Sequence, residues 1–222
     1  MIWLRSYGLY ILLAIACAVT FLWLYFNREK LKAKWYALLI VSLMHIIYGV
    51  ATVRIFAFLE TAGSKTAGNM SIFGAVFFMP IAYFLGAKIS KRKVSLIFDI
   101  FTVPLIATLF CARLNCFLTG CCTGTPIPFM PDVLWPVRGG ELVFYAVILE
   151  IFAVRIRKGL TNGEVYPIYM ISYGVFRFIT QFWRAEYTQI GPLHLSHYWA
   201  ILSIMIGTLI LILMKRSEKN RR

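Results

Sequence analysis

Residues 96–114 read LIFDIFTVPLIATLFCARL, a run in which only Asp99 and Arg113 carry charge. A helix needs about 20 mostly apolar residues to cross the roughly 30 Å of hydrocarbon in a bilayer, so this run predicts a membrane-spanning helix. The other apolar runs of similar length lie at about 7–26, 36–59, 71–88, 140–156, 165–183 and 197–214. The sequence therefore predicts an all-α polytopic membrane protein with about seven transmembrane helices.

The composition supports the same class. Of the 222 residues, 60% are hydrophobic and 14% are charged, and the mean hydropathy is +0.76. A soluble domain carries about 25% charged residues, so a soluble fold is excluded. A net charge of +14 also occurs in nucleic-acid-binding proteins. Here, however, Lys and Arg lie between the apolar runs rather than on one amphipathic face, so no nucleic acid partner is expected.

The basic residues fall unevenly on the two sides of the predicted spans. Sixteen of the 23 Lys and Arg follow the first, third, fifth or seventh run. These sixteen are Arg28, Lys30, Lys32, Lys34, Lys88, Lys91, Arg92, Lys93, Arg155, Arg157, Lys158, Lys215, Arg216, Lys219, Arg221 and Arg222. Because loops rich in Lys and Arg stay in the cytoplasm, this bias predicts an N-terminus outside and a C-terminus in the cytoplasm.

Three arginines, Arg54, Arg113 and Arg177, lie inside the second, fourth and sixth predicted spans. In this orientation those spans run outward. Each arginine falls about 12 to 18 residues along its span, which at about 1.5 Å per residue reaches the outer half of the bilayer. A charged side chain at a bilayer centre costs at least ~2.5–3.5 kcal/mol, so three of them require an anion or a water-filled cavity. We therefore expect a lipid-phosphate site facing the outer leaflet.

The sixth run carries a polar stripe. Tyr173, Arg177, Gln181 and Arg184 are spaced at i, i+4, i+8 and i+11, which places them on one face of a helix. A polar face on a membrane helix must point into the protein. Hydrogen bonding between helices would explain the stripe without a ligand, but its two arginines favour anion binding.

One segment interrupts the helical pattern of what we predict to be a single integral membrane domain over residues 1–222. Residues 115–139 contain prolines at 126, 128, 131 and 136, which are incompatible with a continuous helix. Irregular backbone survives at membrane depth only beside protein or water. We therefore expect this segment to cap the site on the outer side.

Three of the five cysteines, Cys116, Cys121 and Cys122, fall within this segment. The outer side permits disulfides, and adjacent cysteines seldom pair, so Cys116 with either of the others is the expected bridge. The alternative to a disulfide is that the three cysteines are reduced and serve only as small packing residues. Because no histidine or second cysteine pair lies nearby in sequence, no metal site is predicted, and no cofactor is expected.

These features occur in the order of a known family. Ser6–Leu9, Arg54, Gly68–Gly74, Arg113–Gly124 and Tyr173–Arg184 appear at about the separations found in the bacterial prolipoprotein diacylglyceryl transferases, which the chain resembles. The last two segments, which contain the arginine motifs, are specific individually. The others support the resemblance through their order.

The resemblance implies a multi-pass enzyme of the bacterial plasma (inner) membrane with its active site toward the outer leaflet. Its partners would be phosphatidylglycerol and the signal peptide of a preprolipoprotein. The diacylglyceryl group of the lipid would pass to the lipobox cysteine as a thioether, and glycerol phosphate would leave. No oligomeric state is predicted.

Residue roles follow from the matched motifs. Arg113 and Arg177 would hold the phosphate, since a guanidinium pairs bidentately with phosphate and stays charged in apolar surroundings. Tyr7 is assigned a catalytic role as a proton acceptor. The expected substrate-binding residues are Arg54, Ser71, Tyr173, Gln181, Arg184 and Glu141.

The chain also departs from the family pattern. Phe73 stands where the family commonly has a histidine, and Gln181 stands where a glutamate is usual. The best remaining candidate proton acceptors are Tyr7, Glu141 and Tyr173, and His194 and His197 at the outer start of the seventh run are further candidates for a replacement base. Two alternatives therefore stay open. One is a paralogue on the same fold with altered or lost transfer activity, and the other is a non-catalytic lipid-binding or transport protein.

Overall fold

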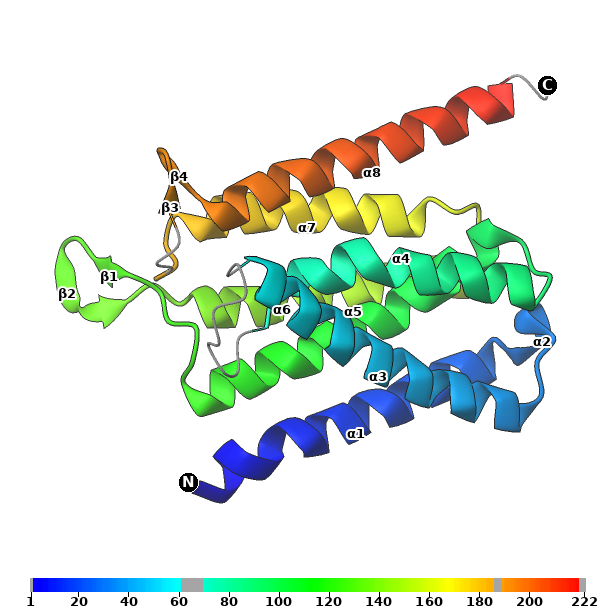
Figure 1. The fold of residues 1–222 in the computed structure, drawn as a ribbon, viewed down its shortest axis with the longest axis horizontal. Coiled ribbons are helices and arrows are strands. Elements are labelled where there is room, and N and C mark those ends of the chain that lie inside the picture. The colour runs from blue at the N-terminus through cyan, green and yellow to red at the C-terminus, as the bar shows by residue number, and fades with distance from the viewer. Residues whose placement is uncertain (1, 61–69, 186–188, 220–222) are drawn as a thin grey trace.

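A computed structural model describes residues 2–60, 70–185 and 189–219, and the described structure is mainly α-helical (Figure 1). The elements are α1 Ile2–Phe26, α2 Arg28–Leu31, α3 Trp35–Glu60, α4 Ile72–Ile89, α5 Val94–Thr119, β1 Pro126–Ile127, β2 Met130–Leu134, α6 Val137–Arg157, α7 Val165–Gln181, β3 Gln189–Ile190, β4 Leu193–His194 and α8 Leu195–Lys219. The predicted all-α class is confirmed. Four residues that support the sequence-based predictions lie outside the described residues, namely Gly68, Asn69, Arg221 and Arg222.

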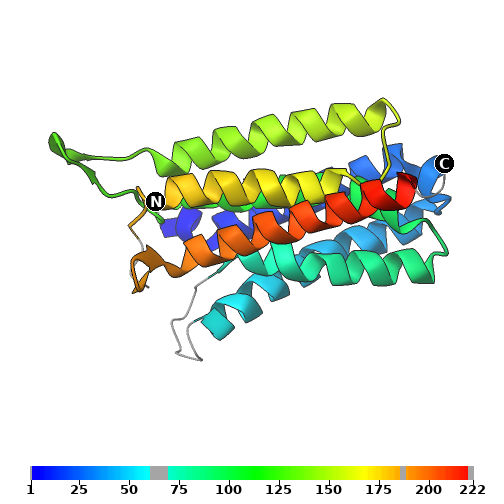
Figure 2. The same ribbon diagram turned by 90° about the horizontal axis from the view of Figure 1, so that it is seen from above.

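The long helices lie side by side with their axes in one general direction (Figures 1 and 2). The start of α1 and both β-hairpins lie at one end of this bundle. The short helix α2 and the end of α8 lie at the opposite end, together with the loops that follow α4 and α6. The segments rich in Lys and Arg therefore share the end opposite the hairpins.

Five described helices contain segments long and apolar enough to cross a membrane. These segments are Tyr7–Phe26, Trp35–Glu60, Ile72–Ile89, Val94–Thr119 and Leu195–Arg216. Helices α6 and α7 are not among them, because α7 has 17 residues and α6 carries five charged residues, which are Arg138, Glu141, Glu150, Arg155 and Arg157. Length and composition thus establish five candidate spans, and the count of seven remains a prediction.

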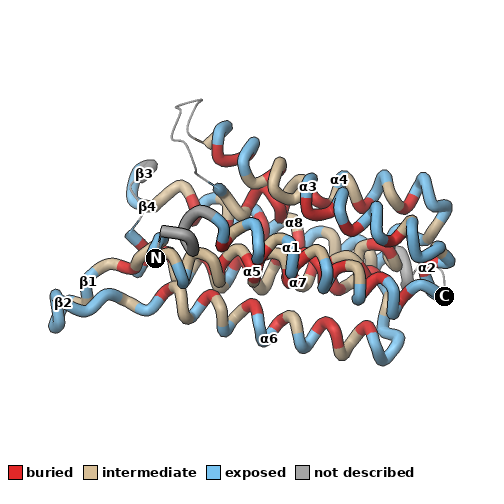
Figure 3. The backbone as a smooth tube through the Cα atoms, turned by 90° about the horizontal axis from the view of Figure 1, so that it is seen from below, coloured by how far each residue is buried: buried red, intermediate tan, exposed pale blue. Residues whose placement is uncertain are grey.

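Helix α5 lies at the centre of the bundle, in contact with α1, α4, α6 and α7. Its buried side chains include Ile100, Leu105 and Ile106, each at most 2% exposed. Burial is concentrated on the inward faces of the helices, and apolar side chains cover much of the outward faces (Figure 3). An apolar exterior is the surface that a helix bundle presents to lipid.

Helices α7 and α8 approach each other closely at two glycines. A Cβ atom on Gly174 would lie 2.8 Å from the carbonyl oxygen of Ala200, and one on Gly207 would lie 2.8 Å from that of Pro167. Small residues at such positions let helix backbones pack tightly in membranes. The close packing fixes α8 beside the polar stripe of α7.

Asp99 connects α5 to the start of α7. Its carboxylate accepts hydrogen bonds from the backbone N–H groups of Gly163, at 2.6 Å, and Val165, at 3.0 Å. The side chain is fully buried. These bonds satisfy backbone donors at a helix N-terminus that would otherwise lack partners.

The irregular segment is shorter than predicted at both ends. Helix α5 continues to Thr119 and ends at Gly120, whose φ of 76° is the left-handed conformation that glycine adopts at helix ends. Helix α6 begins at Val137, so the non-helical part is 120–136 rather than 115–139. Within it, β1 and β2 form an antiparallel hairpin.

Candidate functional site

Glu141 is the centre of a buried charge cluster in the first turns of α6, and its side chain is only 3% exposed. Its carboxylate oxygens lie 3.2 Å from Arg113 Nε, 3.2 Å from Arg177 Nη1 and 2.8 Å from Arg184 Nη1. All three arginines are less than a tenth exposed. One carboxylate thus joins the end of α5, the start of α6 and the end of α7.

The position of Arg184 depends on the loop that follows α5. Arg184 pairs with Gly124 in a short antiparallel bridge, and the N–H of Thr125 donates to the carbonyl of Trp183 at 2.9 Å. A Cβ on Gly124 would lie 2.3 Å from the carbonyl oxygen of Trp135, so only glycine fits there. These backbone contacts hold Arg184 against Glu141 although α7 has already ended.

The cluster has an excess of positive charge. Three guanidinium groups face one carboxylate, which leaves two positive charges uncompensated among the described ion pairs. Burial and the neighbouring Arg177 and Arg113 lower the pKa of Arg184 below its usual range. Uncompensated buried charge is expensive, so the cluster is suited to bind an anion.

Each arginine keeps donors for such an anion. A guanidinium has five N–H donors, and Glu141 engages one nitrogen of each arginine. Arg177 Nη2 makes one further contact, with Ser196 Oγ at 3.5 Å, which brings the start of α8 to the site. The carboxylate therefore orients the three guanidinium groups without exhausting their hydrogen-bonding capacity.

Buried aromatic rings lie beside the arginines. The ring of Tyr173 lies 6.3 Å from that of Tyr145 and 6.0 Å from that of Tyr169, and all three side chains are at most 2% exposed. The hydroxyls of Tyr145 and Tyr169 have no hydrogen-bond partner among the described residues. Phe73 packs on Tyr173 at 5.5 Å. The position at which the family commonly has a histidine is thus part of an apolar wall.

The polar stripe of α7 points inward, as its spacing predicts. This holds for Tyr173, Arg177 and Gln181, which are buried on α7. Arg184 is buried as well, but it follows the end of α7, so the loop contacts place it rather than the helical spacing. The role proposed for Glu141 as a proton acceptor fits less well, because its carboxylate serves as the shared counterion of three arginines. Sequence reasoning missed this role. The sequence does contain a signal for it, because several arginines in apolar spans require a carboxylate partner. Glu141 is a candidate for that partner, since it is the only Asp or Glu in the first turns of α6.

Three predicted residues lie elsewhere. Arg54 is exposed on α3 and makes no ion pair with a described residue. Ser71 precedes α4, and its N–H donates to the carbonyl of Val53 at 3.1 Å, which connects the start of α4 to α3. Tyr7 is 53% exposed on α1. The roles of these three residues stay predictions, and none of them is among the side chains that pair with Glu141.

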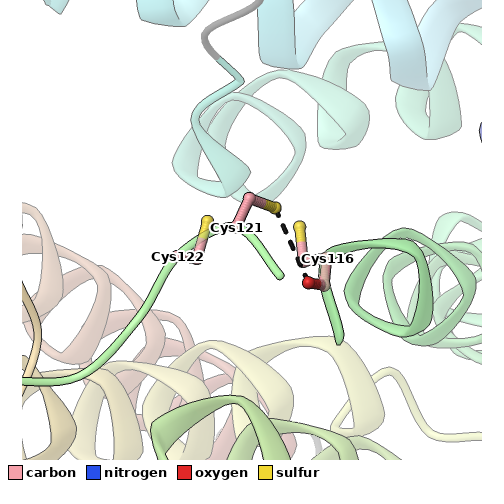
Figure 4. A group of neighbouring side chains, drawn as sticks. All are labelled: Cys116, Cys121 and Cys122. Atoms are coloured by element: carbon pink, nitrogen blue, oxygen red, sulfur yellow. Dashed lines mark hydrogen bonds between the residues drawn. The ribbon is translucent and has the colours of Figure 1, made fainter. Parts of the chain in front are cut away.

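The expected disulfide is not formed. All five cysteines lie within the described residues, and none of them is joined to another by a disulfide in this structure. The Sγ atoms of Cys116, Cys121 and Cys122 nevertheless lie within 4.8 Å of one another (Figure 4). The pKa of the Cys122 thiol is lowered, first by a hydrogen bond from the Cys116 thiol and then by the guanidinium groups of Arg184 and Arg113. Burial acts in the opposite direction but is outweighed.

A separate cavity of about 480 Å³ lies between α4, α5, α7 and α8. Its lining includes Val76, Phe98, Met170 and Ile206 and contains no charged side chain. It can take an apolar group, but it has no cation for a phosphate, and the hydroxyl of Tyr166 in its lining already donates to the carbonyl of Val76. The anion chemistry therefore belongs to the Glu141 cluster.

Comparison with known sequences gives consistent matches. A sequence model of the family described as "Prolipoprotein diacylglyceryl transferase" matches residues 1–213 of the chain. The phosphatidylglycerol--prolipoprotein diacylglyceryl transferase of Clostridium tetani is 28% identical over 158 residues, which are 64% of this chain and 64% of that protein.

Two further relatives with the same name give similar figures. That of Idiomarina loihiensis is 30% identical over 68% of this chain and 61% of its own length. That of Pasteurella multocida is 31% identical over 70% of this chain and 63% of its own length. The chain therefore spans less than two thirds of the length of these relatives.

Proposed function

This chain belongs to the prolipoprotein diacylglyceryl transferase family, and we propose that it transfers the diacylglyceryl group of phosphatidylglycerol to the lipobox cysteine thiol of a preprolipoprotein. The observation that carries the proposal is the pairing of Arg113, Arg177 and Arg184 with the single carboxylate of Glu141. A buried site with two excess positive charges suits a reaction in which a phosphate is the leaving group.

The negative charges of the reactants and products match the two excess positive charges of the arginine cluster. The substrate sulfur forms a bond to the terminal glyceryl carbon, the bond from that carbon to the phosphate oxygen breaks, and glycerol phosphate leaves. Before transfer, the phosphodiester carries one negative charge and the thiolate another. Afterwards the phosphate monoester carries about two, because its second pKa is about 6. The two excess positive charges can therefore compensate reactants and products alike.

Arg113 and Arg177 bind the phosphate in this proposal, and Arg184 shares the developing charge. Donors aimed at a leaving group lower the barrier most when they are already oriented before the reaction. Glu141 supplies that orientation, because it fixes one nitrogen of each guanidinium. Ser196 adds a second anchor for Arg177.

The proton of the substrate thiol needs an acceptor, and Phe73 provides none. Nearby arginines lower the pKa of a thiol. We propose that the cluster acidifies the incoming thiol in this way, so that water can take the proton. The hydroxyls of Tyr145 and Tyr169, buried close to Arg113, are available to hydrogen-bond the glycerol part of the headgroup.

The proposed setting is a bacterial plasma membrane, with α6 and α7 as the remaining two of seven spans. The N-terminus would be outside and the C-terminus cytoplasmic, because the basic segments share the end of the bundle that holds the end of α8. The arginine cluster would then face the outer leaflet and meet the signal peptide there.

Phe73 also supports a second candidate, a paralogue that binds phospholipid with altered or lost transfer. One experiment separates the two. Purified protein is incubated with phosphatidylglycerol vesicles and a lipobox peptide, and the peptide is analysed by mass spectrometry. A thioether-linked diacylglyceryl peptide with release of glycerol phosphate supports the transferase. Saturable lipid binding without modified peptide supports the paralogue instead.

A further inference from the structure

We infer that Cys116, Cys121 and Cys122 form a binding site for a soft d10 metal ion, of the class that includes Zn(II) and Cu(I). Their three Sγ atoms, one ligand from each residue, lie within 4.8 Å of one another. The site is beside the Glu141 cluster and does not depend on the transfer reaction proposed above.

Two unusual backbone conformations bring the sulfurs together. Gly120 ends α5 with a φ of 76°, and Cys122 has a φ of 57°. The left-handed region costs a non-glycine residue energy, and such residues cluster at functional sites. Here the turn returns the chain over the last turn of α5, so that Cys121 and Cys122 lie near Cys116 (Figure 4).

The surrounding contacts hold this turn in place. Cys121 Sγ lies 3.7 Å from the carbonyl oxygen of Cys116 and 3.5 Å from Thr119 Oγ1. Directly after Cys122, the carbonyl of Thr123 accepts a hydrogen bond from the N–H of Ala185 at 3.1 Å. The three cysteines are thus partly preorganised rather than dispersed along a free loop.

The sulfur spacing is close to what a metal requires. A Zn–S bond of about 2.3 Å places the sulfurs of one ion roughly 3.8–4.0 Å apart. Contraction of the present spacing by up to about 1 Å would therefore complete the site. Side-chain rotation of cysteine covers such a distance without movement of the helices.

The ligand type selects the ion. No histidine or carboxylate among the described residues joins the three sulfurs. Hard ions such as Mg²⁺ and Ca²⁺ require oxygen ligands, whereas thiolates select Cu(I) and Zn(II). Three thiolates fill a trigonal shell for Cu(I), or leave one position of a zinc tetrahedron open.

Charge in the neighbourhood favours the same site. Three thiolates with Cu(I) carry two negative charges, and with Zn(II) they carry one. Arg113 and Arg184 lie close enough for their positive charge to interact with this sulfur group. These guanidinium groups attract an anionic metal–thiolate complex, an attraction that an isolated trithiolate in apolar surroundings would lack.

The test titrates the full-length, reduced protein in detergent with Cd²⁺, whose thiolate complexes absorb in the ultraviolet. We expect one Cd²⁺ per chain. Competition with Zn²⁺, and separately with Cu(I) buffered by a chromogenic chelator, identifies the preferred ion. Occupied protein should also be protected from alkylation at three of its five cysteines, counted by intact mass.

Single variants provide the comparison. Cys116→Ser, Cys121→Ser and Cys122→Ser should each weaken binding by about a hundredfold or more. Cys17→Ser, in α1 and outside the sulfur group, is the matched control and should bind as the parent protein does. Circular dichroism and size-exclusion chromatography establish that each variant is folded.

The inference is overturned by any of three results. The first is that the reduced parent protein takes up no Cd²⁺. The second is that folded Cys121→Ser and Cys122→Ser variants bind Cd²⁺ as the parent protein does. The third is that Cys116 forms a disulfide with Cys121 or Cys122 that persists in reductant and excludes the metal.

Discussion

Arg184 Nη1 lies 2.8 Å from Glu141 Oε1, although 43 residues separate the two along the chain. Both side chains are at least nine-tenths buried, and the same carboxylate also pairs with Arg113 and Arg177. A single substitution at Glu141 should therefore affect three arginines, whereas substitution of one arginine leaves the other two paired.

Lysine at position 113 or 177 should abolish most of the proposed transfer activity. Lysine keeps the charge but loses the planar fork that binds phosphate bidentately. The loss should approach the ~3 kcal/mol typical of a missing transition-state donor, or roughly a hundredfold in kcat/KM for thioether formation. Arg157→Lys, exposed at the opposite end of α6, is the control. Near-normal turnover in both variants would mean that the phosphate binds elsewhere.

Glu141→Gln should destabilise the protein. The change preserves shape but leaves three buried guanidinium groups without a counterion, and breaking a buried charge pair costs about 3–5 kcal/mol. Thermal unfolding in detergent measures the loss, with the exposed Glu150→Gln on the same helix as control. Added phosphatidylglycerol should stabilise Glu141→Gln more than the parent protein, because the lipid phosphate replaces the lost negative charge. Equal stabilisation of the two proteins would argue against an anion site.

The proposed topology predicts where reporter fusions will be active. Fusions at Lys34, Lys93, Arg157 and Arg222 should all report the cytoplasm, because these positions follow the spans whose loops carry the basic residues. A periplasmic signal from any of the last three would contradict the seven-span arrangement. A periplasmic signal at Arg157 or Arg222 would point in particular to α6 or α7, which fall short of the length and composition of a span.

Cys121→Ser and Cys122→Ser should leave the proposed transfer nearly intact when metal is absent. The thiol that reacts belongs to the substrate, and neither cysteine pairs with Glu141. The same peptide assay measures this, run with a chelator present. A folded but inactive Cys121→Ser protein would place the chemistry on the wrong residues.

Alkylation of Cys122 should persist at lower pH than that of an ordinary thiol. The hydrogen bond from Cys116 and the charges of Arg184 and Arg113 lower its pKa, so its reactive thiolate remains as the pH falls. For a free cysteine with a pKa of about 8.5, the rate with iodoacetamide drops roughly tenfold per pH unit below that value. Peptide mapping between pH 8 and pH 6 should show a much smaller drop at Cys122. A tenfold drop per unit there would contradict the lowered pKa.

Local pattern was sufficient for part of the site. The burial of Tyr173, Arg177 and Gln181 on one face of α7 follows from helical spacing, and the prediction of a negatively charged partner follows from the cost of charge in a membrane. The long apolar runs likewise indicate the helices of the bundle. These inferences need only the geometry of a single helix and the properties of its solvent.

Other features depend on tertiary contacts that no local pattern contains. The sequence predicts a similar depth for Arg54 and Arg113, but depth does not determine which way a side chain points around the bundle, and Arg54 is exposed. Glu141 meets its partners only because α5, α6 and α7 converge. The sequence predicts too early an end for α5, because residues 116–119 are as compatible with a loop as with a helix, and only Gly120 marks the true end.

The hydrogen bonds from Gly163 and Val165 to Asp99 influence the position of the distant arginine cluster. They fix the register of α7 against α5 at the end of the bundle opposite the arginines. From Asp99 to Arg113 is about 21 Å of helix, and from Val165 to Arg177 is about 18 Å. Because Asp99 joins the starts of these two distances, Arg113 of α5 and Arg177 of α7 lie at nearly the same level along the bundle axis. A change of one residue in the length of either helix would shift its arginine by about 1.5 Å and rotate it by about 100°, away from the shared carboxylate.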